Sequence, residues 1–200
     1  MKTSNTFWIV LAILPFFALV GKAQTAKLNL KESSILVKGT SSLHDWRCKT
    51  EQIAGDISYK ADALTLKDIT ALDLQLAVKS MRSIKENGNY YESGMDKNMY
   101  KALNAEKFPK ITFTLIDISN VKASAGKADF VAKGNLTIAG NQKPISFPVN
   151  ATLTANGIVF KGTTTFKMTS FGVTPPRALL GTIKTGDEIT IEFNVSFKNN

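Results

Sequence analysis

Residues 127–168 read KADFVAKGNLTIAGNQKPISFPVNATLTANGIVFKGTTTFKM, and this stretch decides the fold. Apolar and polar residues alternate along it in three runs, separated by a polar turn at 140–142 and by Asn156-Gly157. Neighbouring side chains on a strand point to opposite faces of a sheet, so each run has one apolar and one wet face. Asn-Gly favours a tight hairpin because both residues tolerate positive φ. The stretch therefore predicts a meander of three antiparallel strands.

The same alternation recurs outside the meander. Eight antiparallel strands with an apolar face close most economically into a barrel, which removes exposed sheet edges. A two-sheet sandwich is the alternative, and Pro148 indicates an edge, a bulge or imperfect closure in its strand. A change of phase at Ile69 indicates a bulge. The further strands are a broken one over 28–37, two long ones over 46–59 and 64–78, a short one over 111–115 and a last one over 189–197.

One segment, residues 80–109, breaks the strand pattern. Ser93 is placed to cap a short helix in which Met95 and Met99 recur at helical spacing. A long loop over 171–186 precedes the last strand. We therefore predict an all-β fold, an eight-stranded antiparallel barrel with one short helix and a long loop closing its ends.

The first 23 residues have the composition of a secretory signal peptide. Lys2 precedes an apolar run over 7–20, and small residues lead up to Ala23. This run contains Pro15 and is short for a membrane span. We expect cleavage after Ala23, one domain over 24–200, and a periplasmic or secreted location.

Charge and cysteine content exclude several classes of protein. There are 25 lysines and arginines against 16 acidic residues, but the lysines, such as Lys133 and Lys161, are spread along outward strand positions. We interpret them as solubilising surface and edge protection, and expect no nucleic-acid partner. Cys48 is the single cysteine, so no intrachain disulfide is possible; we expect it half-buried beside Trp46. With one cysteine and one histidine, no metal site is predicted, and no cofactor fingerprint is present.

The stretch SSLHDW at 41–46 is the one that looks catalytic. One hypothesis is a hydrolase centred on Ser42, His44 and Asp45. However, adjacent residues on extended backbone point apart, whereas a catalytic triad converges from separated positions. We favour the alternative, a polar turn that positions Trp46 and leaves His44 as a polar contact at a barrel mouth.

The apolar faces of the predicted strands are rich in phenylalanine. These rings can fill a small barrel completely, or they can line a slot for a flexible apolar chain. Gly134 and Gly162 share the inward parity and leave room, which favours a cavity. The predicted lumen residues are Trp46, Leu74, Leu76, Phe113, Leu115, Phe130, Ile145, Phe147, Phe160, Phe166, Ile191 and Phe193. The predicted mouth or lid residues are His44, Met95, Met99, Arg177, Leu179 and Leu180.

Several segments, taken in order, resemble the YceI-like proteins. Residues 93–113 (SGMDKNMYKALNAEKFPKITF) are similar to the family's helix-then-strand signature, and residues 134–144 (GNLTIAGNQKP) to its central hairpin. Residues 166–176 and 186–193 are similar to its C-terminal part. The resemblance implies an exported, lipocalin-like barrel whose lumen holds a polyisoprenoid, an isoprenoid quinone or another amphiphile. It implies no enzymatic activity for the family as a whole.

We therefore expect a non-enzymatic carrier or store for a polyisoprenoid, quinone or fatty acyl lipid. Two other hypotheses stay open: the hydrolase described above, and a filled barrel whose basic exterior serves as an envelope-interaction module. A transient contact with a membrane surface and a homodimer also stay open. No cofactor is expected.

Overall fold

The computed structural model describes residues 23–91 and 93–199. The predicted signal peptide, residues 1–23, lies outside the described residues except for Ala23. The strands are β1 (Ala23–Leu28), β2 (Ser34–Ser41), β3 (Trp46–Thr50), β4 (Ile53–Asp62), β5 (Thr65–Ala77), β6 (Met81–Ile84), β7 (Lys110–Ser124), β8 (Lys127–Ile138), β9 (Asn141–Thr154), β10 (Gly157–Lys167), β11 (Arg177–Ala178) and β12 (Ile183–Asn199). The helices are α1 (Gly94–Ala102) and the short 3-10 turns η1 (Leu30–Glu32), η2 (Val78–Ser80), η3 (Met168–Phe171) and η4 (Leu179–Gly181).

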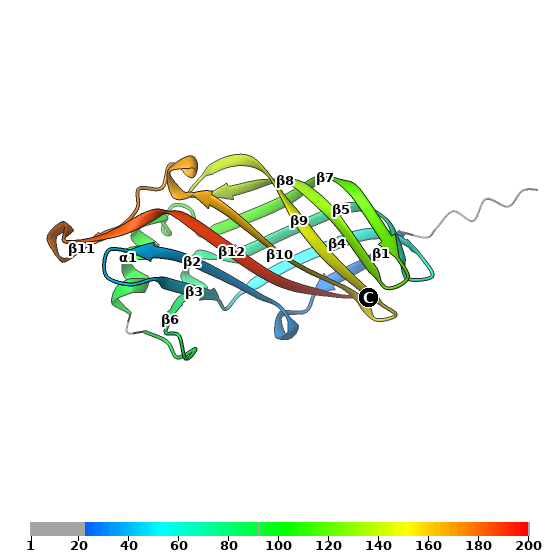
Figure 1. Cartoon of the computed structure of the whole chain (residues 1–200), viewed down its shortest axis with the longest axis horizontal. Helices are drawn as coiled ribbons and strands as arrows, with labels where there is room; N and C mark the ends of the chain where they lie inside the picture. Colours follow the sequence, from blue (N-terminus) through cyan, green and yellow to red (C-terminus); the bar gives the residue numbers. More distant parts are fainter. Residues whose placement is uncertain (1–22, 92, 200) are drawn as a thin grey trace, which may run out of the picture.

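Eight of the described strands close into a ring. They pair antiparallel in the order β1-β4-β5-β7-β8-β9-β10-β12, and β12 returns to β1, where Leu28 lies opposite Phe197. Figure 1 shows the resulting tilted barrel. The predicted eight-stranded antiparallel barrel with one helix is confirmed. The sandwich alternative is wrong, because one sheet runs continuously around the whole ring.

The sheet is interrupted at three places in its N-terminal half. The break predicted within residues 28–37 is confirmed, but the predicted strand over 46–59 is two strands, and β6 is a strand within residues 80–109 that the sequence did not predict. The turn η1 separates β1 from β2, residues 51–52 separate β3 from β4, and η2 separates β5 from β6. Beyond these breaks the sheet continues from β12 through β2 and β3 to β6. The predicted irregularity at Ile69 is present, since the β4–β5 register shifts where Tyr59 meets Ile69. The three breaks let one end of the barrel splay outward.

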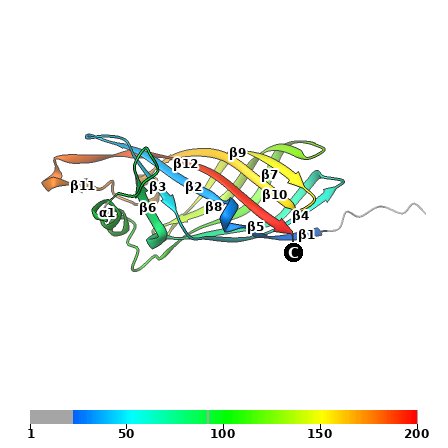
Figure 2. The same cartoon turned by 90° about the horizontal axis from the view of Figure 1, so that it is seen from below.

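Helix α1 covers the splayed end beside β6. It begins after the predicted cap Ser93, although the Ser93 side chain makes no capping hydrogen bond. The Asp96 carboxylate, 3% exposed, accepts hydrogen bonds from the Ser83 N–H at 2.7 Å and from Nε of Arg82 at 2.8 Å. The Tyr100 hydroxyl donates to a β6 carbonyl at 2.6 Å. Figures 1 and 2 place α1 and β11 at the same end of the barrel, away from the C-terminus.

The opposite end of the barrel is filled by side chains. The Tyr59 side chain is 1% exposed, and its hydroxyl donates to the Asn199 amide oxygen at 2.8 Å. The Phe160 and Phe197 rings meet edge to face at 5.9 Å. Burial of this apolar area is the main stabilising term for the closed end. The fully packed residues are Ala26, Ile57, Tyr59, Leu66, Ala128, Ala151, Leu153, Ile158 and Phe197.

The ring is incomplete between β9 and β10. Strand β9 pairs with β8 along nearly its whole length, but with β10 only from Val149 to Thr154. Among the described residues, no ladder therefore joins residues 141–148 of β9 to residues 163–167 of β10. The imperfect closure predicted from Pro148 is present at this seam.

Proline explains where the seam begins. Ala139 and Gly140 both have positive φ, 48° and 79°, in a two-residue turn, which makes Ile138–Asn141 a hydrogen-bonded pair of the β8–β9 hairpin. Counting along β9 from this pair, the N–H groups of even-numbered residues point towards β10. Pro144 and Pro148 stand at two of these positions and have no N–H to donate. The sequence analysis predicted the β8–β9 turn at residues 140–142. The observed turn, Ala139-Gly140, begins one residue earlier.

Candidate ligand-binding cavity

Two adjoining cavities occupy the barrel between its filled end and α1. The inner cavity has a volume of about 120 Å³ and the outer one about 280 Å³. Four residues, Ile35, Leu76, Ile111 and Ile191, line both of them and form the waist between them. Small-molecule sites in proteins span roughly 300–1,000 Å³. Together the two cavities make an elongated hollow of that order.

The inner cavity is almost entirely apolar. Of the described residues that line it, only Gln75, Thr112 and Thr164 have polar side chains. The phenylalanine rings stand around it in tilted or edge-to-face contact, with Phe147 at 5.5 Å from both Phe113 and Phe193. Ten predicted lumen residues lie in its lining, namely Leu74, Leu76, Phe113, Leu115, Phe130, Ile145, Phe147, Phe160, Ile191 and Phe193.

The two inward glycines do not leave room for a guest. A Cβ atom on Gly134 would lie 2.3 Å from Cζ of Phe113, and one on Gly162 would lie 2.5 Å from Cζ of Phe193. Neighbouring rings therefore occupy the space that the missing side chains vacate, as aromatic residues do beside glycines in other sheets. The expectation from the sequence was wrong on this point. The cavity exists because the rings spread around the barrel wall.

The outer cavity combines an apolar body with a polar rim. Two predicted lumen residues, Trp46 and Phe166, line it. So do four predicted mouth residues, His44, Met95, Met99 and Arg177, and methionine adapts readily to irregular apolar ligands. Polar side chains of the lining that the sequence analysis did not single out are Ser41, Ser83, Asn98 and Thr185. Polarity thus rises from the inner cavity to the mouth.

The SSLHDW stretch forms a polar turn at this mouth. The Ser41 hydroxyl oxygen accepts the His44 N–H at 3.2 Å, and Nε1 of Trp46 donates to the Thr40 carbonyl at 3.0 Å. The Ser42 hydroxyl oxygen accepts a backbone N–H at 3.0 Å. Nδ1 of His44 lies 2.6 Å from the Asp45 backbone carbonyl, not from a carboxylate. Within the described residues, Ser42, His44 and Asp45 are not assembled into a catalytic triad.

Two predicted lid residues lie away from both cavities. Leu179 is 72% exposed and Leu180 is fully exposed, and neither lines a cavity in the described part of the chain. The loop contributes Phe171 and Val173 instead, which are 2% and 3% exposed and line the outer cavity. A strand period could not identify these two residues, because they lie in and after a 3-10 turn.

Cys48 is more deeply buried than predicted. It is 3% exposed rather than half-buried, and its Sγ lies 3.6 Å from the Ser83 hydroxyl on β6. Burial raises the pKa of the Cys48 thiol to about 11. A protonated, enclosed thiol is a small apolar group of the cavity wall, and an intermolecular disulfide through it would require the barrel to open.

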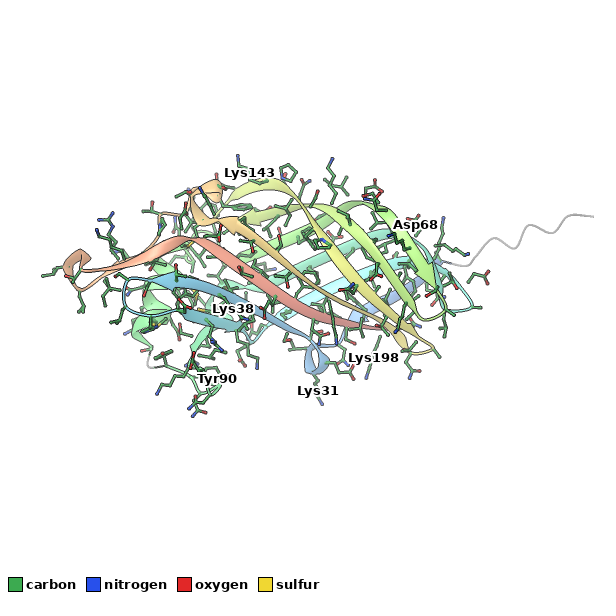
Figure 3. All side chains as sticks on the ribbon, viewed as in Figure 1. Lys31, Lys38, Asp68, Tyr90, Lys143 and Lys198 are labelled. Atoms are coloured by element: carbon green, nitrogen blue, oxygen red, sulfur yellow. The ribbon has the colours of Figure 1, made fainter. Side chains whose placement is uncertain are left out.

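Surface charge is dispersed over the barrel. Figure 3 shows Lys31, Lys38, Lys143 and Lys198 on four different elements. Over residues 23–91 and 93–199, no group of three or more histidine, cysteine or acidic side chains is placed to hold a metal ion. In the same part of the chain, no helix is long and apolar enough to cross a membrane.

Comparison with known proteins identifies relatives over most of the chain. The family model of the YceI-like domain matches residues 27–197. A UPF0312 protein of Shewanella baltica (strain OS185) is 34% identical over 130 residues, which are 60% of each chain. The chain thus spans about 60% of the length of the curated relatives that it matches.

Solved structures share the fold. BcnA of Burkholderia cenocepacia has a TM-score of 0.64 and 16% identity, over 84% of this chain and 98% of that chain. A polyisoprenoid binding domain from Saccharophagus degradans has a TM-score of 0.64 and 12% identity, over 88% and 99%. Sequence identities this low show only that the fold is shared. Because the family model covers residues 27–197, well over half of the chain, this chain belongs to the YceI-like domain family.

Proposed function

We propose that this protein is an exported, non-enzymatic binding protein that carries or stores one long apolar chain inside the barrel. The ligand classes that fit are a polyisoprenoid, an isoprenoid quinone or a fatty acyl lipid. The observation that carries the proposal is the gradient of polarity along the hollow, from an inner cavity lined by phenylalanine and aliphatic residues to a rim with His44, Asn98 and Arg177. An amphiphile has the same gradient.

Burial of the apolar tail supplies the binding energy. Each methylene that leaves water stabilises the complex by about 0.8 kcal/mol, less the cost of ordering a flexible chain. The inner lining offers no charged group that would oppose an apolar ligand. The polar rim then sets the direction of entry, with the head group at the mouth. Family membership and the polyisoprenoid-binding domain of Saccharophagus degradans support the same reading.

A pair of tryptophan variants tests the proposal at the waist. Ile111 lines both cavities, whereas its neighbour Lys110 is exposed on the outer face of β7. We expect Ile111→Trp to weaken binding of a fluorescent polyene fatty acid by about tenfold or more, because the indole displaces two or three methylenes of ligand. Lys110→Trp adds the same ring outside and should leave the affinity unchanged.

Fluorescence enhancement of the polyene measures both affinities, and circular dichroism verifies that both variants are folded. Equal affinity in the two variants, or no binding by the parent protein, would contradict the proposal. The export part of the proposal rests on the composition of residues 1–23. Recovery of the protein from the periplasmic or extracellular fraction of producing cells is the expected result, and retention in the cytoplasm would refute it.

A further inference from the structure

The β11–β12 hairpin projects from the barrel at the cavity end, as both Figure 1 and Figure 2 show. Its ladder is only two residues long, and the turn η4 forms its tip. Leu179 and Leu180 occupy this tip, where Leu179 is 72% exposed and Leu180 is fully exposed. Two adjacent leucines with most of their surface in solvent form an exposed apolar patch, and such patches often mark contact sites.

A second turn carries another exposed leucine beside this hairpin. Leu43, in the turn between β2 and β3, is 66% exposed. The two turns are tied together at Lys184, whose carbonyl accepts the Ser42 N–H at 2.9 Å and whose N–H donates to the Ser42 hydroxyl at 3.0 Å. The three leucines therefore lie on two joined turns at one end of the molecule.

Turn geometry does not explain leucine at the hairpin tip. Leu179 and Leu180 have φ of 47° and 55°, a left-handed conformation that favours glycine and asparagine. Leu64 also has positive φ, 67°, but is 43% exposed, and its carbonyl accepts the Gly126 N–H. Leucine at the hairpin tip is unfavourable twice, because its backbone has positive φ and its apolar side chain lies in water. We interpret this as a sign that the tip contacts a surface outside the chain.

The charges at the base of the hairpin indicate what that surface is. Arg177 lies directly opposite Lys184 in the ladder, and like charges in this position repel each other. Residues 172–186 contain no acidic residue. Among the described residues, neither cation forms an ion pair. A phosphate group between the two side chains would turn this repulsion into attraction.

The hairpin is also continuous with the mouth of the outer cavity. Arg177, Ala178 and Ile183 belong both to the hairpin and to the cavity lining. A flat surface that touches the leucines would therefore face the opening. The hairpin has apolar side chains at its tip and cations at its base. A bilayer interface has the complementary order, with acyl chains beneath anionic head groups.

We propose that this docking tip, formed by Leu43, Leu179, Leu180, Arg177 and Lys184, binds the surface of an anionic lipid bilayer. The leucines enter the boundary between head groups and acyl chains, and the two cations contact lipid phosphates. Docking presents the mouth of the cavity to the membrane. The inference does not depend on which ligand the cavity holds.

Flotation of the purified protein with vesicles tests the docking tip. We expect binding to phosphatidylcholine vesicles that contain phosphatidylglycerol, and weaker binding without it or in high salt. The double variant Leu179→Ser/Leu180→Ser should reduce the bound fraction about tenfold or more, since two apolar side chains no longer leave water. Arg177→Gln/Lys184→Gln should abolish the preference for phosphatidylglycerol.

Matched controls lie at the filled end of the barrel. Leu64→Ser removes an exposed leucine of positive φ, and Lys122→Gln/Lys127→Gln removes two exposed cations; both should float like the parent protein. Polyene binding without vesicles should be unchanged in Leu179→Ser/Leu180→Ser, because neither leucine lines a cavity, and this separates docking from ligand binding. The proposal is overturned if the parent protein does not float, or if tip and control variants behave alike. A dimer that the leucine variant dissociates, without vesicle binding, would assign the tip to a second copy instead.

Discussion

At the scale of single residues, Cys48 links burial to stability. Its thiol has a pKa of about 11 in the folded barrel, raised chiefly by burial, whereas an unfolded cysteine titrates at about 8.5. Below pH ~8.5 both states hold the proton, and the stability that this burial contributes is fully present. As pH rises from ~8.5 to ~11, the unfolded state loses the proton first, so folding becomes less favourable.

We therefore predict that the free energy of unfolding falls with alkaline pH more steeply in the parent protein than in Cys48→Ala. The difference between the two should change by about 2–3 kcal/mol across this window, on the order of 1.4 kcal/mol per pKa unit. Urea unfolding at a series of pH values measures it. Parallel curves for the two proteins would show that Cys48 ionises as easily in the barrel as in the unfolded chain.

Individual residues also show where sequence reasoning stops. Inward parity correctly placed Phe113 and Phe193 on the barrel lumen, but it could not tell that their rings would cover Gly134 and Gly162. Parity gives the direction of a side chain and says nothing of its rotamer. The depth of Cys48 was underestimated for a related reason, because its cover comes from β6 and not from its own strand.

At the scale of elements, the seam between β9 and β10 makes a prediction about hydrogen exchange. The hairpin register directs the N–H groups of Ile145 and Phe147 towards β8, while those of Gln142 and Ser146 point to the seam. We expect the first pair of amides to exchange at least about tenfold more slowly than the second, since only they are held in a ladder.

Amide exchange followed by nuclear magnetic resonance resolves these four positions. Slow exchange at Gln142 and Ser146, equal to that of their neighbours, would mean that β9 pairs with β10 beyond Pro148 and that the barrel wall is complete. The amides of Asn150 and Thr152, which point towards β10 in the part of β9 that does pair with it, serve as an internal reference.

Strands and helices were predicted correctly where the periodic pattern of apolar residues continues over many residues. The predictions were incomplete where that pattern is interrupted. The meander, the last strand and α1 have clear periods, and the structure contains each of them. The break within residues 28–37 was predicted from the sequence, whereas the break at residues 51–52 and the strand β6 follow from how the sheet bends around the ring, which no local pattern encodes. Pro148 is the exception, because a missing N–H has the same consequence in any sheet.

At the scale of the whole molecule, the barrel is solid at one end and hollow at the other. The filled barrel that the phenylalanine content also allowed describes the region around Tyr59 and Phe197. Towards α1, the sheet splays and the side chains no longer meet across the lumen. The outer part of the hollow draws residues from a helix and a loop, such as Asn98 and Phe171, and these could not be found from strand parity.

The composition of the purified protein tests the central claim most directly. Native mass spectrometry of protein isolated from producing cells should show one lipid-sized adduct per chain, which organic solvent releases as a polyisoprenoid, quinone or acyl lipid. The Ile111→Trp variant should carry less of it than Lys110→Trp. A bare mass for the parent protein, with no lipid in the solvent extract, would contradict the claim that the barrel holds an apolar guest.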